Sequence, residues 1–278
     1  MTHSPTSATA SWRMPHISLG IHRVIAHQFS LAVMGIESTV IQGRKGLGKS
    51  TAVKVCSQKF EEAELSRELE TPGGEPARRV LYFEASTALG RKTALMDLYT
   101  DVVGRGGVRL RQTYTPKDLV EAIADELCTQ NYRVLIVDEA QKIDAPNHDQ
   151  LRQILDAVWA RDHAFGMMLV GMPPLRELII ANGELGQRYA GYIEMEGFTV
   201  SDLAAHLEGL HPELPPLRRQ HGEAAWQELV NDLVRITGGS VRRLKSILEN
   251  ANVFAMSRGT AMTWRNLQQA MDKLPTEV

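Results

Sequence analysis

The chain has 278 residues, of which 43% are hydrophobic, and a formal net charge of −2. This length and composition fit one large or two small folded domains and exclude disorder of the whole chain. No apolar run approaches the roughly 20 residues of a bilayer span, and the first ten residues do not resemble a signal peptide, so we expect a cytoplasmic protein with no membrane partner.

The N-terminal part of the chain predicts a tail, a helix and a strand, in that order. Residues 1–15 carry Ser, Thr and Pro with few large apolar groups, which is typical of a flexible tail. Residues 21–34 have the apolar spacing of a helix, and the short β-branched run at 38–42 predicts a strand.

The stretch GRKGLGKST at 43–51 follows this strand and has the spacing G-x-x-x-x-G-K-[ST]. Glycines allow successive backbone N–H groups to form a concave nest for a β-phosphate, at the start of a helix. Lys49 would reach the β- and γ-phosphate oxygens, and the Ser50 hydroxyl would coordinate Mg²⁺. We therefore expect contacts to ATP from Gly43, Lys45, Gly46, Gly48, Lys49, Ser50 and Thr51. The alternative is a glycine turn with an unrelated lysine.

The next segments alternate between helix, loop and strand. Residues 61–76 are charged and then turn-rich, so a helix end and an exposed loop are expected, and the run at 79–85 predicts a strand. Two helices are predicted at 93–103 and 116–130, the second with Pro at its first position. The loop between them is basic and rich in glycine.

Two acidic residues end the run Arg-Val-Leu-Ile-Val-Asp-Glu-Ala-Gln at 133–141. Four consecutive apolar residues predict a strand buried on both faces of a parallel sheet, and ligands bind at the carboxyl ends of such strands. Asp138 would hold Mg²⁺ through water, and Glu139 would polarise the attacking water. An acidic cap between strand and helix is the alternative, although it explains one carboxylate better than two.

Further along, the pattern predicts a helix at 147–160 and a strand at 167–171, and from residue 199 onward the strands stop. A capping box at Thr199 predicts a helix to about residue 209, followed by a Pro-rich hinge at 211–217. Three more helices are predicted near 223–237, 240–257 and 263–273. The fold class is therefore α/β: a doubly wound parallel sheet with a P-loop, followed by a small all-helical domain.

Only Cys56 and Cys128 are present, too few for a metal cage or a disulfide framework. Both are expected to pack as small apolar residues.

The P-loop, the run Val-Asp-Glu-Ala-Gln and the segment TGGSVRRL at 237–244 together resemble the AAA+ ATPases. Within these, the compact length and the Asp-Glu-Ala-Gln form resemble the transposition regulators TnsC, TniB and MuB. The resemblance covers roughly residues 20–273 and implies a nucleotide-binding domain at 16–198 and a helical lid domain at 199–278. Secretion-associated ATPases and helicase loaders of the DnaC/IstB kind share much of the pattern.

The resemblance also assigns arginines to the nucleotide. Arg242 occupies the position of a sensor 2 arginine, which contacts the nucleotide from the lid, and Arg243 is the alternative. Arg188 stands where such ATPases often place an arginine finger that reaches the neighbouring subunit, although a surface arginine is an equal alternative. Lys49, Glu139, Arg188 and Arg242 are thus the expected catalytic residues, with Asp138 as a ligand of both nucleotide and metal.

One position departs from this pattern. Related ATPases usually place Asn, Thr or Ser after the fourth strand, whereas this chain has Met172, whose thioether is a poor hydrogen-bond partner. We therefore expect slow hydrolysis, with ATP acting mainly as an assembly switch.

Residues 91–117 carry a local excess of positive charge, with six basic residues and two acidic ones. In the regulators that the chain resembles, this segment faces the channel of a helical oligomer, so it would contact DNA phosphates. The expected DNA-binding residues are Arg91, Lys92, Thr93, Arg105, Arg109, Arg111, Thr113, Thr115 and Lys117. No aromatic ladder is evident, so duplex is favoured over single strands. A solvated charged loop is the alternative.

The resemblance implies a regulator of transposition that forms a ring or a helical filament of its own copies on double-stranded DNA with ATP and Mg²⁺. It would mark a target for a transposase, with a target-selector protein as a further partner, and disassemble on hydrolysis. Three alternatives remain open: an ATPase that remodels proteins or serves secretion and never touches DNA, a helicase loader, and a nucleotide-gated scaffold without useful turnover.

Overall fold

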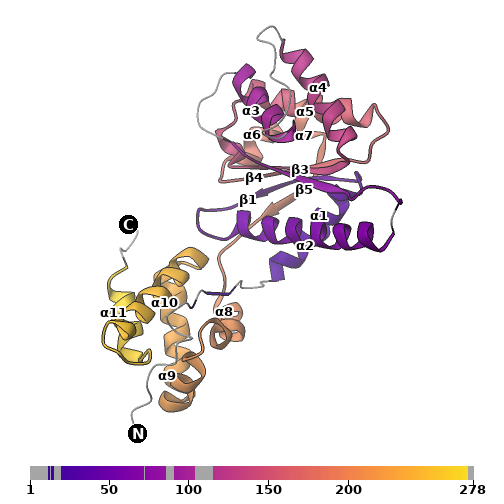
Figure 1. Cartoon of the computed structure of the whole chain (residues 1–278). Helices are drawn as coiled ribbons and strands as arrows, with labels where there is room; N and C mark the ends of the chain where they lie inside the picture. The colour runs from indigo at the N-terminus through magenta and orange to yellow at the C-terminus, as the bar shows by residue number, and fades with distance from the viewer. Residues whose placement is uncertain are drawn as a thin grey trace. The chain divides into compact units, whose positions relative to one another are not determined.

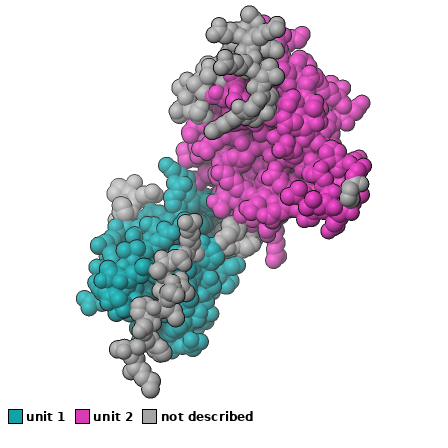
Figure 2. All heavy atoms as spheres, in the orientation of Figure 1, with its two compact units in different colours: residues 1–20, 45–48, 196–278 teal, residues 21–44, 49–195 magenta. Residues whose placement is uncertain are grey.

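The computed structural model describes residues 12, 14–15, 20–71, 73–85, 91–103 and 115–274, and in residues 91–94 and 145–146 it describes the backbone alone. The chain divides into two compact units (Figure 1, Figure 2). Unit 2 comprises residues 21–44 and 49–195, and unit 1 comprises residues 1–20, 45–48 and 196–278.

Unit 2 is built on a parallel sheet of five strands in the order β2-β3-β4-β1-β5. The strands are β1 (Ser38–Gln42), β2 (Arg79–Glu84), β3 (Tyr132–Asp138), β4 (Gly166–Gly171) and β5 (Tyr189–Glu194). Because β4 pairs with both β1 and β3, the carboxyl end of β4 lies between those of the other two. This arrangement brings the segments after β1, β3 and β4 to one edge of the sheet, where open α/β sheets bind ligands.

Helices cover both faces of the sheet (Figure 1). On one face lie α1 (Gly20–Val33) and α2 (Lys49–Glu70), and on the other lie α3 (Arg91–Val103), α4 (Pro116–Thr129) and α5 (Ala145–Trp159). All residues of β1 and β4 are buried, because central parallel strands have no solvent-facing side.

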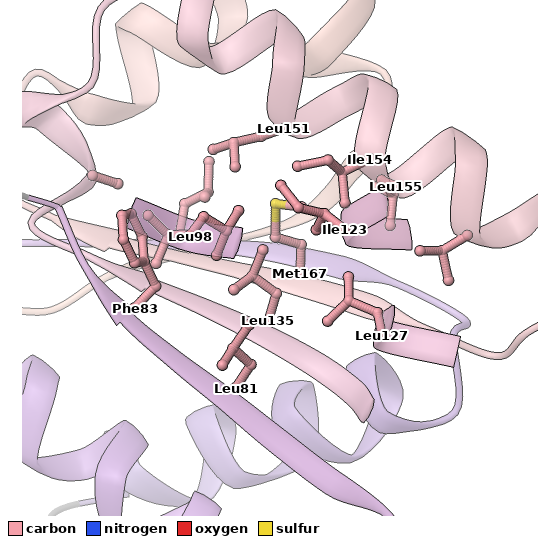
Figure 3. Packing of buried hydrophobic residues seen from close by; sticks show 14 of the residues in the cluster. Leu81, Phe83, Leu98, Ile123, Leu127, Leu135, Leu151, Ile154, Leu155 and Met167 are labelled. Carbon is pink, nitrogen blue, oxygen red and sulfur yellow. The ribbon is translucent and has the colours of Figure 1, made fainter. Parts of the chain in front are cut away.

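The main hydrophobic core lies between the sheet and the second of these helical layers (Figure 3). Leu135 of β3 and Met167 of β4 face Ile123 of α4 and Ile154 of α5, and all four side chains are fully buried. Alternate strand residues such as Ile136 point to the opposite face, as the period of two requires. The doubly wound α/β fold expected from the sequence is thereby confirmed.

Unit 2 also holds elements that the sequence pattern did not predict. These are the 3-10 turn η2 (Ala140–Lys142), the short helices α6 (Leu175–Ala181) and α7 (Gly183–Gly186), and the edge strand β5. In β5 only every second residue is buried, so its sequence lacks the continuous apolar run by which the central strands are recognised. The helix after the P-loop continues to Glu70, within the segment 61–76 where a helix end was expected.

Unit 1 is helical from residue 200 onward. It contains α8 (Val200–His206), η3 (Leu207–Leu210), α9 (Leu214–Thr237), α10 (Val241–Met256) and α11 (Trp264–Asp272). The prediction of a Pro-rich hinge at 211–217 was wrong in part, because Pro215 and Pro216 lie in the first turn of α9, where no intrahelical N–H bond is lost. Gly222, at φ 81° and ψ 170°, breaks α9 in two and explains why the helical pattern is recognised only from residue 223.

Within the described part of the chain, no helix combines the length and the apolar character needed to cross a bilayer.

Candidate nucleotide-binding site

The loop after β1 forms the phosphate-binding turn that its sequence predicts. It leads directly into α2, whose first residue is Lys49. The Lys49 side chain is almost fully buried, and its ammonium donates hydrogen bonds to the carbonyl oxygens of Gly43 at 2.6 Å and Arg44 at 2.9 Å. The cation therefore lies over the base of the loop, at the N-terminus of a helix, where an anion is stabilised by both charge and dipole.

The tip of the loop, residues 45–48, belongs to unit 1. Gly46 and Gly48 have φ values of +85° and +96°, which L-residues with side chains rarely adopt. The Gly46 carbonyl oxygen accepts hydrogen bonds from the Arg242 backbone N–H at 3.1 Å and from the Ser240 hydroxyl at 3.3 Å. A Cβ on Gly46 would lie 2.7 Å from the Ser240 Oγ, so this contact requires glycine.

Three side chains converge where β2, β3 and α2 meet. The Tyr82 hydroxyl of β2 donates a short hydrogen bond to Oδ2 of Asp138, the last residue of β3. The Ser50 hydroxyl contacts the same tyrosine oxygen. Asp138 is buried, and its other oxygen accepts the Glu139 backbone N–H at 2.9 Å.

Burial and the hydrogen bond to Asp138 raise the pKa of Tyr82 far above its ordinary value, so the phenol stays protonated and keeps its role as donor. The Lys54 ammonium lies 4.4 Å from the centre of the Tyr82 ring. Tyr82 is therefore held from both sides, and the carboxylate that it contacts is fixed in one orientation.

The residues present fit a magnesium ion bound together with a nucleotide. Ser50 and Asp138 reach a common atom, the Tyr82 hydroxyl oxygen, so a hydroxyl and a carboxylate oxygen face one position. Mg²⁺ prefers oxygen ligands and needs only a few from the protein, because it keeps several waters and takes further ligands from phosphates. Among the described residues no group of three or more His, Cys, Asp or Glu is placed to hold a metal ion.

Glu139 stands at the turn that ends β3. Its φ of 55° and ψ of 32° place it in the left-handed region, which is uncommon for a residue other than glycine. Its Oε2 accepts a hydrogen bond from the Gln141 amide at 2.8 Å and lies 3.6 Å from the Lys142 ammonium. This strained turn directs the Glu139 carboxylate away from the axis of β3, toward Gln141 and Lys142 of η2.

The match to a protein-family model covers residues 34–179 and hence the P-loop, both acidic residues and Met172. The model describes an AAA domain, and it spans more than half of the chain. The chain belongs to this AAA domain family. A search of curated proteins found no match.

Solved structures with the same fold include two Aeropyrum pernix ORC proteins and one domain of a replication initiation protein. The Aeropyrum pernix ORC2 protein, solved as ADPNP–ADP complexes, is 19% identical with a TM-score of 0.64, and the match covers 95% of this chain and 70% of that one. The Aeropyrum pernix ORC1 protein, solved in complex with DNA, is 16% identical with a TM-score of 0.60, covering 91% and 64%. Domain III of Thermotoga maritima DnaA is 14% identical with a TM-score of 0.58, covering 92% and 93%. At identities this low, the structural likeness shows a shared fold and nothing more.

Of the remaining predicted nucleotide contacts in this AAA domain protein, Lys45 is exposed in the loop and Thr51 is exposed in the first turn of α2. Arg242 is exposed and Arg243 is half-buried, both in the first turn of α10, where Ser240 caps the helix. The proximity of the Arg242 backbone to Gly46 places this arginine next to the loop tip within unit 1.

Arg188 is engaged within its own unit. Its Nε donates to Asp156 at 2.9 Å, and its guanidinium lies 5.8 Å from the centre of the Trp159 ring. An arginine finger in this position would have to leave that ion pair before it reached a neighbouring subunit.

The predicted DNA-binding residues are only partly described. Arg105, Arg109, Arg111 and Thr113 lie outside the described residues, and Arg91, Lys92 and Thr93 are described by their backbone in the first turn of α3. Lys117 is exposed at the start of α4. The Thr115 hydroxyl caps α4 and bonds to Asp118, so its hydrogen-bonding capacity is largely used within the protein.

Sequence reasoning assigned no role to Tyr82 or Gln141. The tyrosine lies in a strand whose pairing with β3 is visible only in three dimensions, where Glu84 is opposite Asp138. Gln141 was part of the recognised motif, but its two contacts depend on the turn at Glu139. Cys56 and Cys128 are free thiols whose pKa is raised by burial, as expected of packing residues.

Proposed function

We propose that this protein is an ATP-dependent switch that assembles on double-stranded DNA in the cytoplasm, as a regulator of transposition. The observation that carries the ATP-dependent part is the convergence of Ser50 and Asp138 on one oxygen beside a buried Lys49. This arrangement supplies a cation for the phosphates, two oxygen ligands for Mg²⁺ and, one residue further along the chain, a carboxylate for the attacking water.

Each residue has a defined part in binding and hydrolysis. The loop N–H groups and the Lys49 ammonium bind the β- and γ-phosphates, for which Lys49 exchanges its carbonyl partners in the loop for phosphate oxygens. Ser50 would hold Mg²⁺ directly and Asp138 would hold it through water, and the ion would supply positive charge to offset charge that develops on the phosphates. Glu139 orients a water in line with the γ-phosphorus and accepts its proton.

The DNA part of the proposal rests on the basic segment between residues 91 and 117. Lys117, the one member whose side chain is described as exposed, begins α4, and the others precede it in the chain. The Aeropyrum pernix ORC1 protein was solved in complex with DNA, which supports the view that a protein with this fold can bind DNA. Lysines and arginines bind the phosphate backbone without regard to sequence, as a protein that assembles along DNA requires.

Nucleotide would control assembly by contacting two subunits. Arg242 or Arg243 contacts the nucleotide within one copy, and Arg188 from the next copy exchanges Asp156 for the γ-phosphate. ATP then stabilises the ring or filament through contacts that ADP lacks, and hydrolysis releases the copies. In this form the assembly marks a target and engages a transposase, with a target-selector protein as a second partner.

Electron microscopy of the protein with linear duplex tests this proposal, in lanes with ATP, a non-hydrolysable analogue, ADP and no nucleotide. Rings or filaments on DNA are expected only with triphosphate, and they should be lost when Arg91, Lys92 and Arg111 are changed to Ala. Lys49→Ala should abolish nucleotide binding, whereas Glu139→Gln should bind ATP and leave stable assemblies.

Binding of ATP without any association with duplex would refute the DNA part and point to a protein partner. A marked preference for single strands would favour a helicase loader. Affinity for duplex that falls steeply with salt is the expected signature of phosphate contacts.

A further inference from the structure

Gln141 links the two strand ends that flank the proposed reaction centre. It lies in η2, two residues after Glu139. Its amide nitrogen donates to Oε2 of Glu139 at 2.8 Å, and its amide oxygen accepts the backbone N–H of Met172, the residue after β4, at 2.9 Å.

The second of these contacts fixes the orientation of the amide. A backbone N–H only donates, so the atom that faces Met172 must be the amide oxygen. The NH₂ group is then the atom that faces Glu139, and a carboxylate is its proper acceptor. Gln141 therefore presents a donor to Glu139 in a direction set by the end of β4.

The site has room for this side chain because residue 171 is glycine. A Cβ built on Gly171 would lie well inside contact distance of the Gln141 amide oxygen and 2.9 Å from a methyl carbon of Leu175. A larger residue would require the Gln141 amide oxygen and the Leu175 methyl to shift, which would disturb the contact of that oxygen with Met172. The last residue of β4 is thus matched in size to a glutamine on the neighbouring strand end.

We propose that Gln141 is a positioning residue for hydrolysis, which holds the Glu139 carboxylate and supplies a polar side chain where Met172 does not. This inference rests on the proposed ATPase function. Met172 cannot donate a hydrogen bond from its side chain, so its backbone N–H anchors the amide instead. Within the described residues, both the Gln141 and the Lys142 contacts fall on Oε2 of Glu139, which leaves Oε1 to receive the proton of the water.

The amide also limits how Glu139 moves. Glu139 is in the left-handed region and partly exposed. Without the hydrogen bond from the Gln141 amide, its side chain would sample more rotamers. A carboxylate that is in position only part of the time lowers the rate of the chemical step and leaves nucleotide affinity unchanged.

The test compares kcat for ATP hydrolysis with the dissociation constant of a fluorescent ATP analogue in the full chain. For Gln141→Ala and for the isosteric Gln141→Glu, which cannot donate to Glu139, we expect kcat to fall about tenfold or more and the dissociation constant to change less than about threefold. Gly171→Ala should act in the same direction. Met172→Asn should raise kcat by a larger factor in the Gln141→Ala background than in wild type, which a merely structural role of Gln141 does not predict.

Gln58→Ala is the matched control, because Gln58 donates to Glu62 at 2.8 Å on the exposed face of α2 and should be silent. Turnover that survives Gln141→Ala and Gln141→Glu would overturn this inference while leaving the ATPase proposal intact. Loss of analogue binding together with kcat would likewise overturn it. A wild-type protein that binds the analogue without turnover would overturn the ATPase proposal itself, and the inference with it.

Discussion

Tyr82 donates its hydroxyl hydrogen to Asp138 across the pair of strands β2 and β3. The same oxygen is in contact with the Ser50 hydroxyl. A phenol thus stands between the two side chains that we propose for Mg²⁺, and it would compete with such an ion for Oδ2 of Asp138.

Tyr82→Phe should therefore have two separable effects. Without nucleotide, loss of a hydrogen bond to a buried carboxylate should reduce the free energy of unfolding by about 1–3 kcal/mol. With nucleotide, the Mg²⁺ concentration for half-maximal ATP hydrolysis should fall, because the competing donor is gone. Urea unfolding and a magnesium titration measure the two effects.

Tyr192→Phe serves as the control for Tyr82→Phe, since Tyr192 lies on β5 and its ring, which phenylalanine keeps, contacts Arg176. An unchanged or higher magnesium requirement in Tyr82→Phe would contradict the competition between phenol and ion.

Met172→Asn should raise kcat by about threefold to tenfold, because an amide at the end of β4 can hydrogen-bond the γ-phosphate and the water. Steady-state hydrolysis with saturating ATP measures this change. Met256→Asn, at an exposed position of α10, should leave the rate unchanged. A rate that falls in Met172→Asn would show that the thioether itself is needed.

Glu64 ties the C-terminal half of α2 to the start of β2. Its carboxylate is buried and accepts hydrogen bonds from the Arg78 guanidinium, from the Arg78 backbone N–H at 3.1 Å and from Arg67. The hydrogen bonds from Arg78 lower the pKa of Glu64 to about 2. A carboxyl whose folded pKa lies below its unfolded value, about 4.3, stabilises the fold above the unfolded pKa and loses this contribution as pH falls toward the folded one.

Glu64→Gln should consequently reduce the free energy of unfolding by on the order of 2 kcal/mol at pH 7, allowing for the solvent exposure of both arginines. The difference from wild type should shrink as pH falls from about 4.5 toward 2. Denaturant unfolding at several pH values measures it. Glu62→Gln, at an exposed site two residues earlier, should show neither effect. A difference that does not depend on pH would argue against the ion pairs as its source.

Gly166, the first residue of β4, packs closely on the backbone of α1. A Cβ at this position would lie 2.6 Å from the Ala32 Cα. Gly166→Ala should cost about 1–3 kcal/mol, because neither backbone can yield without disturbing the sheet. Gly183→Ala, where the added Cβ meets nothing within 4 Å, should change stability by less than about 0.5 kcal/mol. Thermal unfolding of the two variants side by side tests the contrast, and equal melting temperatures would refute it.

The sequence alone predicted the elements whose signals are local. The four strands with apolar or β-branched runs, the capping box at Thr199 and the P-loop turn were all recognised and are confirmed. These features depend on neighbours a few residues away, through periodicity, capping and glycine spacing. The edge strand β5 alternates and contains glycine, so it carries no comparable signal.

The parts of the site that were missed depend on pairing between distant segments. Tyr82 and Asp138 are 56 residues apart and meet because β2 pairs with β3, and Gln141 meets Met172 across 31 residues because β3 pairs with β4. Arg188 shows the converse, since its sequence position suggested an arginine finger or a surface arginine, and the fold supplies Asp156 as a partner.

The close approach of Gly171 to Gln141 also predicts how these two positions vary among related sequences. A larger residue at 171 would crowd the amide of a glutamine at 141, so a glutamine at 141 favours glycine at 171. In related chains these two positions should therefore vary together, and lineages that keep a polar residue at position 172 should be released from both constraints.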